Sequence, residues 1–188
     1  MVHWAGKHQL SFEQYHQVPV IWQVAPLLEL HQQLGGWFAL ASTPRLALRA
    51  DRPQLSHNHV ALWYNLADGI RAGDSICAEL AVRFIEAHLI VSYAGYARLR
   101  LLRALKNTAL DAKQKFRLSR HFLLRLQQQD REPGFHEVLR LWKKIIPPEH
   151  LLKVKQLVLT TGQQDDKFTL QLLNAFFQSQ TLAQLASN

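Results

Sequence analysis

Apolar residues recur along this chain at the three- and four-residue spacing that places them on one face of an α-helix. Glycines, prolines and polar runs divide the pattern into segments of roughly 15 to 20 residues, as in helical bundles. The predicted helices are 26–34, 45–52, 57–69, 75–91, 93–106, 111–129, 135–146, 149–160, 167–178 and a short segment at 181–186. We therefore expect an all-α fold, a single-domain helical bundle of about seven to nine helices.

The segment 75–91 differs from the others because it is apolar almost all round. At about 100° per residue, its charged residues Glu79, Arg83 and Glu86 fall in one narrow stripe. A helix with this pattern is typical of the centre of a bundle. Asp74 directly precedes it and is a preferred residue type for capping a helix start. The other helices are therefore expected to pack around 75–91.

The length of 188 residues suits one domain. Residues 1–56 show weaker periodicity than the remainder, and they hold short apolar runs that fit either strands or helices. We expect a single helical domain over 1–188, with a less regular part at 1–56 and a helical core at 57–188.

Cysteine usage and apolar runs indicate the compartment. Cys77 is the only cysteine, which excludes an internal disulfide and the usual thiolate zinc sites and fits a reducing cytoplasm. The first residues contain no apolar run of signal-peptide length. The most apolar stretch, 78–95, is interrupted by charged residues that a membrane span would not tolerate. We expect a soluble, cytoplasmic protein without a membrane partner, and Cys77 as a small buried residue.

Positive charge is concentrated in one stretch. Residues 98–125 hold nine basic residues and one acidic residue, so their formal charge of +8 equals that of the whole chain. A strongly basic surface favours polyanionic partners. This stretch is therefore the part of the sequence on which a functional prediction rests.

Helical spacing arranges the basic residues of this stretch in two rows. The first row is Arg100, Arg103 and Lys106, and the second is Lys113, Arg117 and Arg120. The turn between them, at Asn107 and Thr108, suggests an antiparallel hairpin. Whether the two rows form one patch is left open. The side chains expected to face inward from the second helix are Ala112, Phe116, Leu123 and Leu126.

These rows predict a non-enzymatic nucleic-acid-binding protein that contacts the phosphate backbone through the hairpin at 98–125. Lys and Arg on one helix face can replace the counterions of a polyanion. No aromatic residue is expected among the outward basic residues, so contacts to phosphates are predicted rather than base stacking. The protein could be a small subunit of a nucleoprotein complex. RNA versus DNA, sequence preference and oligomeric state stay open.

A second hypothesis is a protein–protein adaptor or inhibitor. It would bind an acidic protein through the basic face, or an apolar partner through the Trp-rich N-terminal part. An exposed cluster of Trp22, Trp37 and Phe38 would favour this function, although tryptophans are most simply core or interface residues.

A third hypothesis comes from the spacing Arg-x4-His, which occurs at Arg83–His88, Arg52–His57 and Arg131–His136. Such a pair resembles the ribonuclease sites of helical domains of the HEPN family. The best-placed pair is Arg83–His88, because it lies on a predicted helix. The resemblance implies a helical ribonuclease with these two side chains exposed together. In the structural alternative, Arg83 pairs with Glu79 four residues earlier.

Other catalytic and metal motifs are weak. His57-x-His59 places its two histidines on different sides of a helix, and Glu13-x-x-His16 is a single copy of a motif that di-iron bundles need twice. The sequence contains no GxSxG, P-loop, GxGxxG or HExxH motif. We therefore expect no catalytic residue, no metal and no cofactor.

Overall fold

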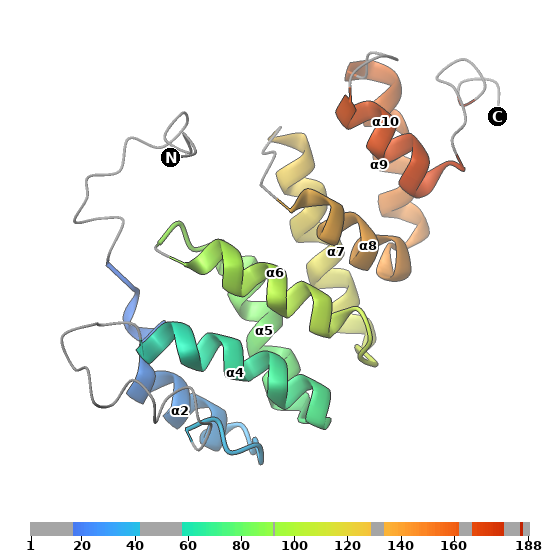
Figure 1. Cartoon of the computed structure of the whole chain (residues 1–188). Helices are drawn as coiled ribbons and strands as arrows, with labels where there is room; N and C mark the ends of the chain where they lie inside the picture. Colours follow the sequence, from blue (N-terminus) through green and yellow to red (C-terminus); the bar gives the residue numbers. More distant parts are fainter. Residues whose placement is uncertain are drawn as a thin grey trace. The chain divides into compact units, whose positions relative to one another are not determined.

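The computed structural model describes residues 17–41, 58–91, 93–128, 134–161 and 167–178, together with Leu185. Over these residues the protein consists of eight α-helices and one short 3-10 helix, without a strand (Figure 1). The all-α prediction and the predicted number of helices are confirmed. The elements are η1 (Val20–Trp22), α2 (Val24–Gln33), α4 (Asn58–Ala72), α5 (Ser75–Ala87), α6 (Ala94–Leu105), α7 (Ala112–Gln127), α8 (Phe135–Ile145), α9 (Pro148–Thr161) and α10 (Lys167–Phe176).

The chain divides into two compact units, Met1–Ala104 and Leu105–Asn188. Each unit is described by itself. The single domain over 1–188 stays a prediction. Several predicted features lie outside the described residues, namely Glu13, His16, the helix 45–52, His57 and Arg131; of the segment 181–186, only Leu185 is described.

In the first unit, α5 supplies the centre of the packing. Its buried residues include Cys77, Leu80 and Phe84, all fully shielded from solvent. α4 packs along α5, and α2 packs against both helices. The ring of Phe84 meets Trp63 of α4 at 4.9 Å and Trp22 of η1 at 5.1 Å between centroids. Large aromatic side chains bury the most apolar area per residue, so this cluster dominates the core of the unit.

The ends of α4 and α5 follow from backbone chemistry. α4 continues through Gly69, where a β-carbon would collide with the sulfur of Cys77, and it ends at Ala72, directly before Gly73, whose φ is +92°. α5 ends at Ala87 rather than at 91, because His88 adopts a left-handed conformation with φ of +46°. A left-handed residue stops the helical hydrogen-bond pattern.

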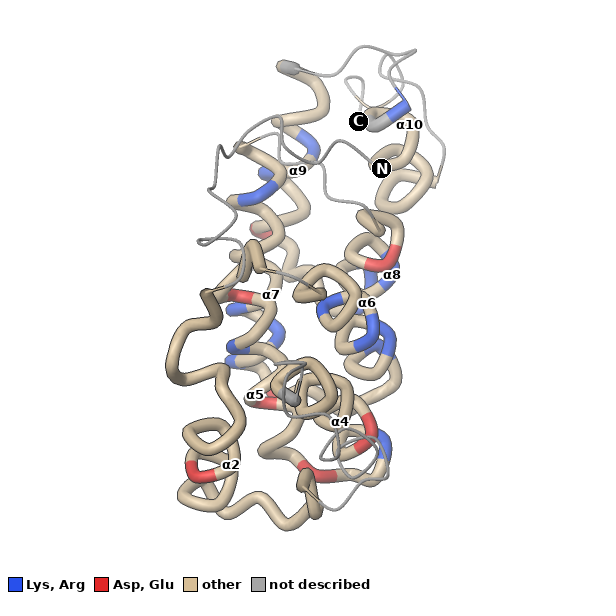
Figure 2. Tube along the Cα trace, turned by 60° about the vertical axis from the view of Figure 1, so that its left-hand side comes forward, with Lys and Arg blue, Asp and Glu red and all other residues tan. Residues whose placement is uncertain are grey.

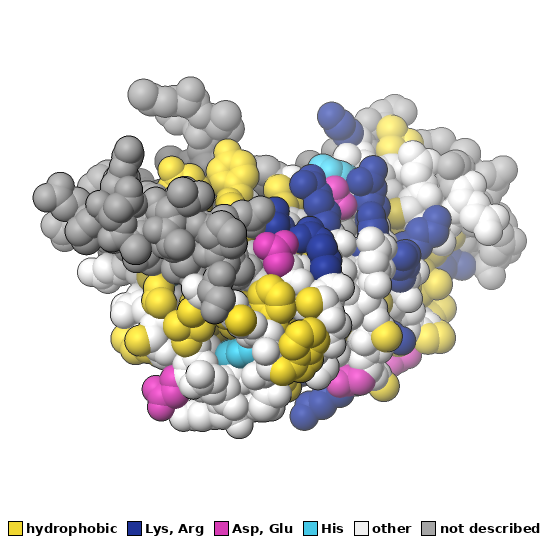
Figure 3. Space-filling model, turned by 60° about the horizontal axis from the view of Figure 1, so that its bottom comes forward, with side chains coloured by type: hydrophobic (Ala, Val, Ile, Leu, Met, Phe, Trp, Pro, Cys, Tyr) yellow, Lys and Arg dark blue, Asp and Glu magenta, His cyan; other side chains and the backbone are white. Residues whose placement is uncertain are grey.

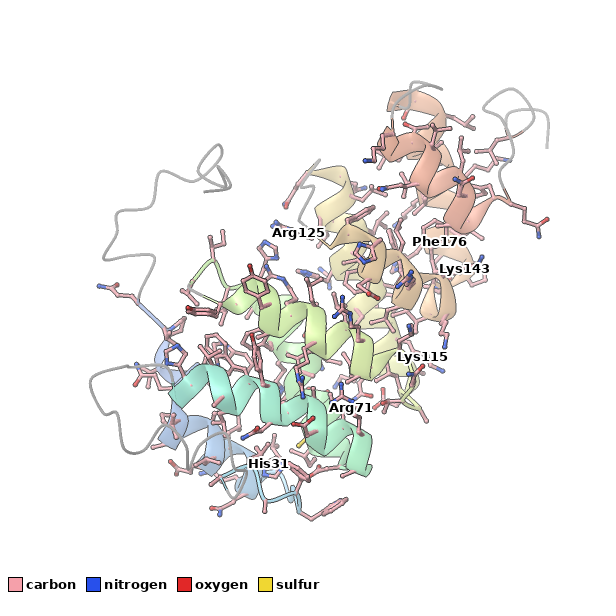
Figure 4. All side chains as sticks on the ribbon, viewed as in Figure 1. His31, Arg71, Lys115, Arg125, Lys143 and Phe176 are labelled. Carbon is pink, nitrogen blue, oxygen red and sulfur yellow. The ribbon has the colours of Figure 1, made fainter. Side chains whose placement is uncertain are left out.

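In the second unit, α7 packs against α8 and α9, and α10 packs against α8 and α9. α7 begins with a capping box in which Asp111 and Gln114 bond reciprocally to each other's backbone N–H. α8 is centred on Trp142, which is fully buried and meets Phe176 of α10 edge-on at 5.2 Å (Figure 4).

The faces of α7 differ from the prediction at its N-terminal end. Leu123 and Leu126 are buried as expected, but Ala112 and Phe116 are exposed. The buried side chains of α7 are Gln114, Leu118, Ser119, Phe122, Leu123 and Leu126. The expectation that Ala112 and Phe116 face the core is therefore wrong. The side of α7 that packs against α8 and α9 is the one that carries Leu118, Ser119 and Phe122.

Candidate nucleic-acid interface

The six predicted phosphate-binding residues divide between the two units. Arg100 and Arg103 lie on α6 in the first unit. The other four belong to the second unit: Lys106 in the turn after α6, and Lys113, Arg117 and Arg120 on α7. Whether the two rows form one patch therefore stays open.

Arg100 already has partners within its own unit. Its guanidinium donates to Asp68 Oδ1 at 2.8 Å and, over 3.4 Å, to the carbonyl of Tyr64, whose ring it also covers at 5.6 Å. These contacts join α6 to α4. A phosphate would have to compete with Asp68 for the guanidinium of Arg100.

The second row lies on the exposed side of α7. At about 100° per residue, Lys113, Arg117 and Arg120 fall within an arc of about 60°. Lys113 and Arg120 are exposed, and Arg117 is half-buried. Over the described ranges, no hydrogen bond or ion pair is recorded for Lys113 or Arg120. Their charges are therefore available to an anion. Figure 2 shows Lys and Arg recurring along α7, α8 and α9.

α9 adds a further cation to this side of α7. His150, near the start of α9, is buried, and burial is the main cause that lowers the pKa of its imidazole. Glu149 opposes this shift, whereas Lys153 and Arg120 reinforce it. Charges from α7 and α9 therefore act on the same ring. We call the residues Lys113, Phe116, Arg117, Arg120 and Lys153 the α7–α9 face.

A buried hydrogen-bond network holds this face together. Ser119 Oγ accepts from the indole N–H of Trp142 at 2.7 Å and lies 2.8 Å from Nδ1 of His150. Because Trp142 uses Ser119 as an acceptor, the hydroxyl hydrogen is available to Nδ1 of the neutral imidazole. One serine thus links α7, α8 and α9 and satisfies three buried polar groups.

This network makes the second unit sensitive to acid. Because the folded state lowers the pKa of His150, the unfolded state binds its proton more readily. The contribution of His150 to the free energy of unfolding is expected to be constant above pH about 6.5. It should fall as the pH drops from there to the pKa of His150 in the folded state. Urea unfolding of His150→Gln should show a weaker decline between pH 7.5 and 5.5 than the wild type. The exposed His136, changed to Gln, is the control, and an unchanged pH response in His150→Gln would contradict the assignment.

The first unit contains a separate buried polar cluster that the sequence analysis missed. His31 Nε2, Asp74 Oδ2 and Cys77 Sγ lie within 4.8 Å of one another. In Figure 4, His31 lies on α2. Asp74 lies 43 positions and Cys77 46 positions after His31 in the sequence, so no local motif indicates the cluster. Asp74 was identified from the sequence only as the cap of α5.

Asp74 is the centre of this cluster and is saturated with donors. Oδ1 accepts from two backbone N–H groups at the start of α5, and Oδ2 accepts from His31 and from two N–H groups of the loop after α2. These hydrogen bonds offset the effect of burial and lower the pKa of Asp74. The five donors are the N–H groups of Ile76, Cys77, Trp37 and Phe38 and Nε2 of His31, at 2.7–3.2 Å.

The cluster combines nitrogen, oxygen and sulfur donors of the kinds that bind Zn²⁺. However, Asp74 already accepts five hydrogen bonds, and His31 uses Nε2 to donate one of them. Burial, reinforced by Asp74, raises the pKa of the Cys77 thiol, which therefore stays protonated and is not a nucleophile. The backbone of Gly36 lies so close to His31 that a β-carbon would collide with its ring. We interpret the cluster as a structural hydrogen-bond centre.

The residues of the ribonuclease hypothesis and of the adaptor hypothesis differ in their exposure to solvent. Arg83 pairs with Glu79 at 2.8 Å and is partly exposed, while His88 caps the end of α5. Because His88 lies beyond the helical end of α5, the pair does not lie on one helix as predicted. Trp22 is buried, whereas Trp37 is 64% exposed. The predicted cluster of Trp22, Trp37 and Phe38 is therefore exposed mainly at Trp37.

Comparison with protein-family models, with curated proteins and with solved structures gave no match. Within the described ranges, no helix has both the length and the apolar character that crossing a membrane requires.

Proposed function

We propose that this protein binds nucleic acid through contacts of the α7–α9 face with the phosphate backbone. The observation that carries the proposal is the convergence of exposed cations from two helices around one buried histidine. Arg120 of α7 and Lys153 of α9 act on the His150 ring, and Lys113 lies on the same exposed side of α7 as Arg120. Phosphate oxygens are recognised by such groups, and each contact releases a counterion.

The distribution of charge supports the same surface. Residues 105–188 hold thirteen basic and seven acidic residues, whereas 1–104 hold nine and seven. The excess positive charge thus belongs mainly to the second unit. In the space-filling view, basic side chains gather on part of the surface with few acidic side chains among them (Figure 3). Lys106 of the predicted set, in the same unit, would extend the contact beyond α7.

The test is a salt series with fluorescently labelled single- and double-stranded RNA and DNA. About four phosphate contacts predict a slope of log affinity against log salt of about −2.8 to −3.6, or roughly a 50- to 150-fold loss between 50 and 200 mM salt. Poly-glutamate of matched charge is the control for an acidic protein partner. Absence of binding at 50 mM salt, or equal affinity for poly-glutamate, would overturn the proposal.

An adaptor function is the second candidate, and the exposure of Trp37 favours it. Trp37 is 64% exposed, and Val20 and Ile21 of the same unit are also exposed. Binding of a protein partner at this position would bury the indole. The nucleic-acid series separates the two functions, because an adaptor working through Trp37 would give no salt-dependent binding to oligonucleotides.

A further inference from the structure

Phe116 is an aromatic side chain left in solvent among cations. It is 47% exposed, although α7 buries six other side chains. Its ring lies 5.2 Å from the His150 ring between centroids, with 34° between the two planes. One side of the phenyl ring is thus supported by His150, and the ring remains half accessible.

The support beneath Phe116 is rigid. His150 is buried, and its Nδ1 is held by Ser119, which is itself bound by Trp142. A ring that rests on a fixed neighbour loses little conformational freedom when a second ring stacks on it. Phe116 is therefore preorganised as a flat apolar surface.

Cations surround this surface at helical spacing. Lys113 precedes Phe116 by three residues, and Arg120 follows it by four, so both are its neighbours on the surface of α7. Lys153 of α9 acts on the same His150 ring that supports Phe116. Phe116 directly follows Lys115, which Figure 4 labels on α7.

We propose that Phe116 is a stacking platform for an unpaired base and that the α7–α9 face therefore binds single-stranded nucleic acid. This inference rests on the proposed function. Single-strand binding combines cations that follow the backbone with an aromatic ring on which a base stacks. In a duplex both faces of each internal base are already covered by stacking, so the ring of Phe116 would gain no partner there. An apolar protein partner is disfavoured because it would have to bury Lys113 and Arg120 without counterions.

The experiment compares Phe116→Leu with the wild type on three probes. These are a labelled oligo-dT strand, an abasic strand with the same number of phosphates, and a duplex. Loss of one base stack is expected to weaken oligo-dT binding about 5- to 100-fold. Binding to the duplex and to the abasic strand should change less than twofold, and Phe116→Trp should restore oligo-dT binding. Tyr96→Leu is the matched control, because Tyr96 is 69% exposed on α6.

The outcomes separate the inference from the proposed function. One outcome is that the wild type binds all three probes with the same salt dependence and that Phe116→Leu binds oligo-dT as tightly as the wild type does. In that case the stacking platform is refuted and backbone binding stands. If the wild type binds none of the probes, both fail together. If Phe116→Leu weakens all three probes equally, Phe116 acts on the shape of the face, and stacking is refuted. Thermal unfolding of the variant checks that the fold is retained.

Discussion

Asp74→Ala is expected to reduce the free energy of unfolding by about 4 kcal/mol or more. The carboxylate accepts five hydrogen bonds that join the start of α5, the loop after α2 and His31. Hydrogen bonds to a charged group contribute about 1.5–3 kcal/mol each, and buried donors left without a partner cost about 1–3 kcal/mol. A domain is stable by only about 5–15 kcal/mol, so this change is expected to unfold much of the first unit.

Urea unfolding followed by circular dichroism measures the effect, and Asp111→Ala is the matched control. Asp111 also caps a helix, but its side chain accepts only from Gln114 N–H, so about 1 kcal/mol is expected. Asp74→Asn should be nearly as damaging as Asp74→Ala, because an amide NH₂ in place of Oδ2 would face three donors. Equal losses in Asp74→Ala and Asp111→Ala would contradict the central role of Asp74.

The triple variant Lys113→Gln, Arg120→Gln and Lys153→Gln is expected to lose about 100- to 500-fold in affinity for nucleic acid at 0.1 M salt. Counterion release contributes roughly five- to eightfold for each phosphate contact at that concentration. The slope of log affinity against log salt should become shallower by about 2 to 3. All three side chains are exposed, so the fold should be retained.

The control for this variant is Arg71→Gln, Arg83→Gln and Lys167→Gln, which removes the same formal charge elsewhere. Arg71 and Arg83 form surface ion pairs with Asp68 and Glu79, whose loss costs little stability. The control should bind within about threefold of the wild type, since only the screened long-range field changes. Equal losses in the two variants would show that net charge, rather than the α7–α9 face, determines binding.

Much of the local structure could be predicted from sequence because it depends on neighbouring residues. Asp74 and Asp111 mark the starts of α5 and α7, where their side chains bond N–H groups two and three residues away. The salt bridge between Glu79 and Arg83 follows from a spacing of four residues. The basic row of α7 follows from the same periodicity.

The errors arose where a neighbouring helix decides the environment of a residue. Phe116 is an apolar residue of a type usually found in the core. However, α9 packs on α7 so that the ring of Phe116 lies against His150 and stays half exposed. The sequence also did not indicate that Arg100 pairs with Asp68, 32 residues earlier, and its role as a phosphate contact stays a prediction. The helix ending at 87 instead of 91 reflects the left-handed backbone of His88.

The helical class, most helix positions, the caps of α5 and α7 and the concentration of positive charge could all be read from the sequence alone. These properties depend on contacts within one turn or one helix, where residue spacing fixes the geometry. The packing of the helices, in contrast, determines that Asp74 accepts from three segments, that Ser119 joins three helices and that Phe116 lies half exposed against His150. Such groupings bring together residues distant in the chain, and they depend on how helices rotate against one another, which no local spacing encodes.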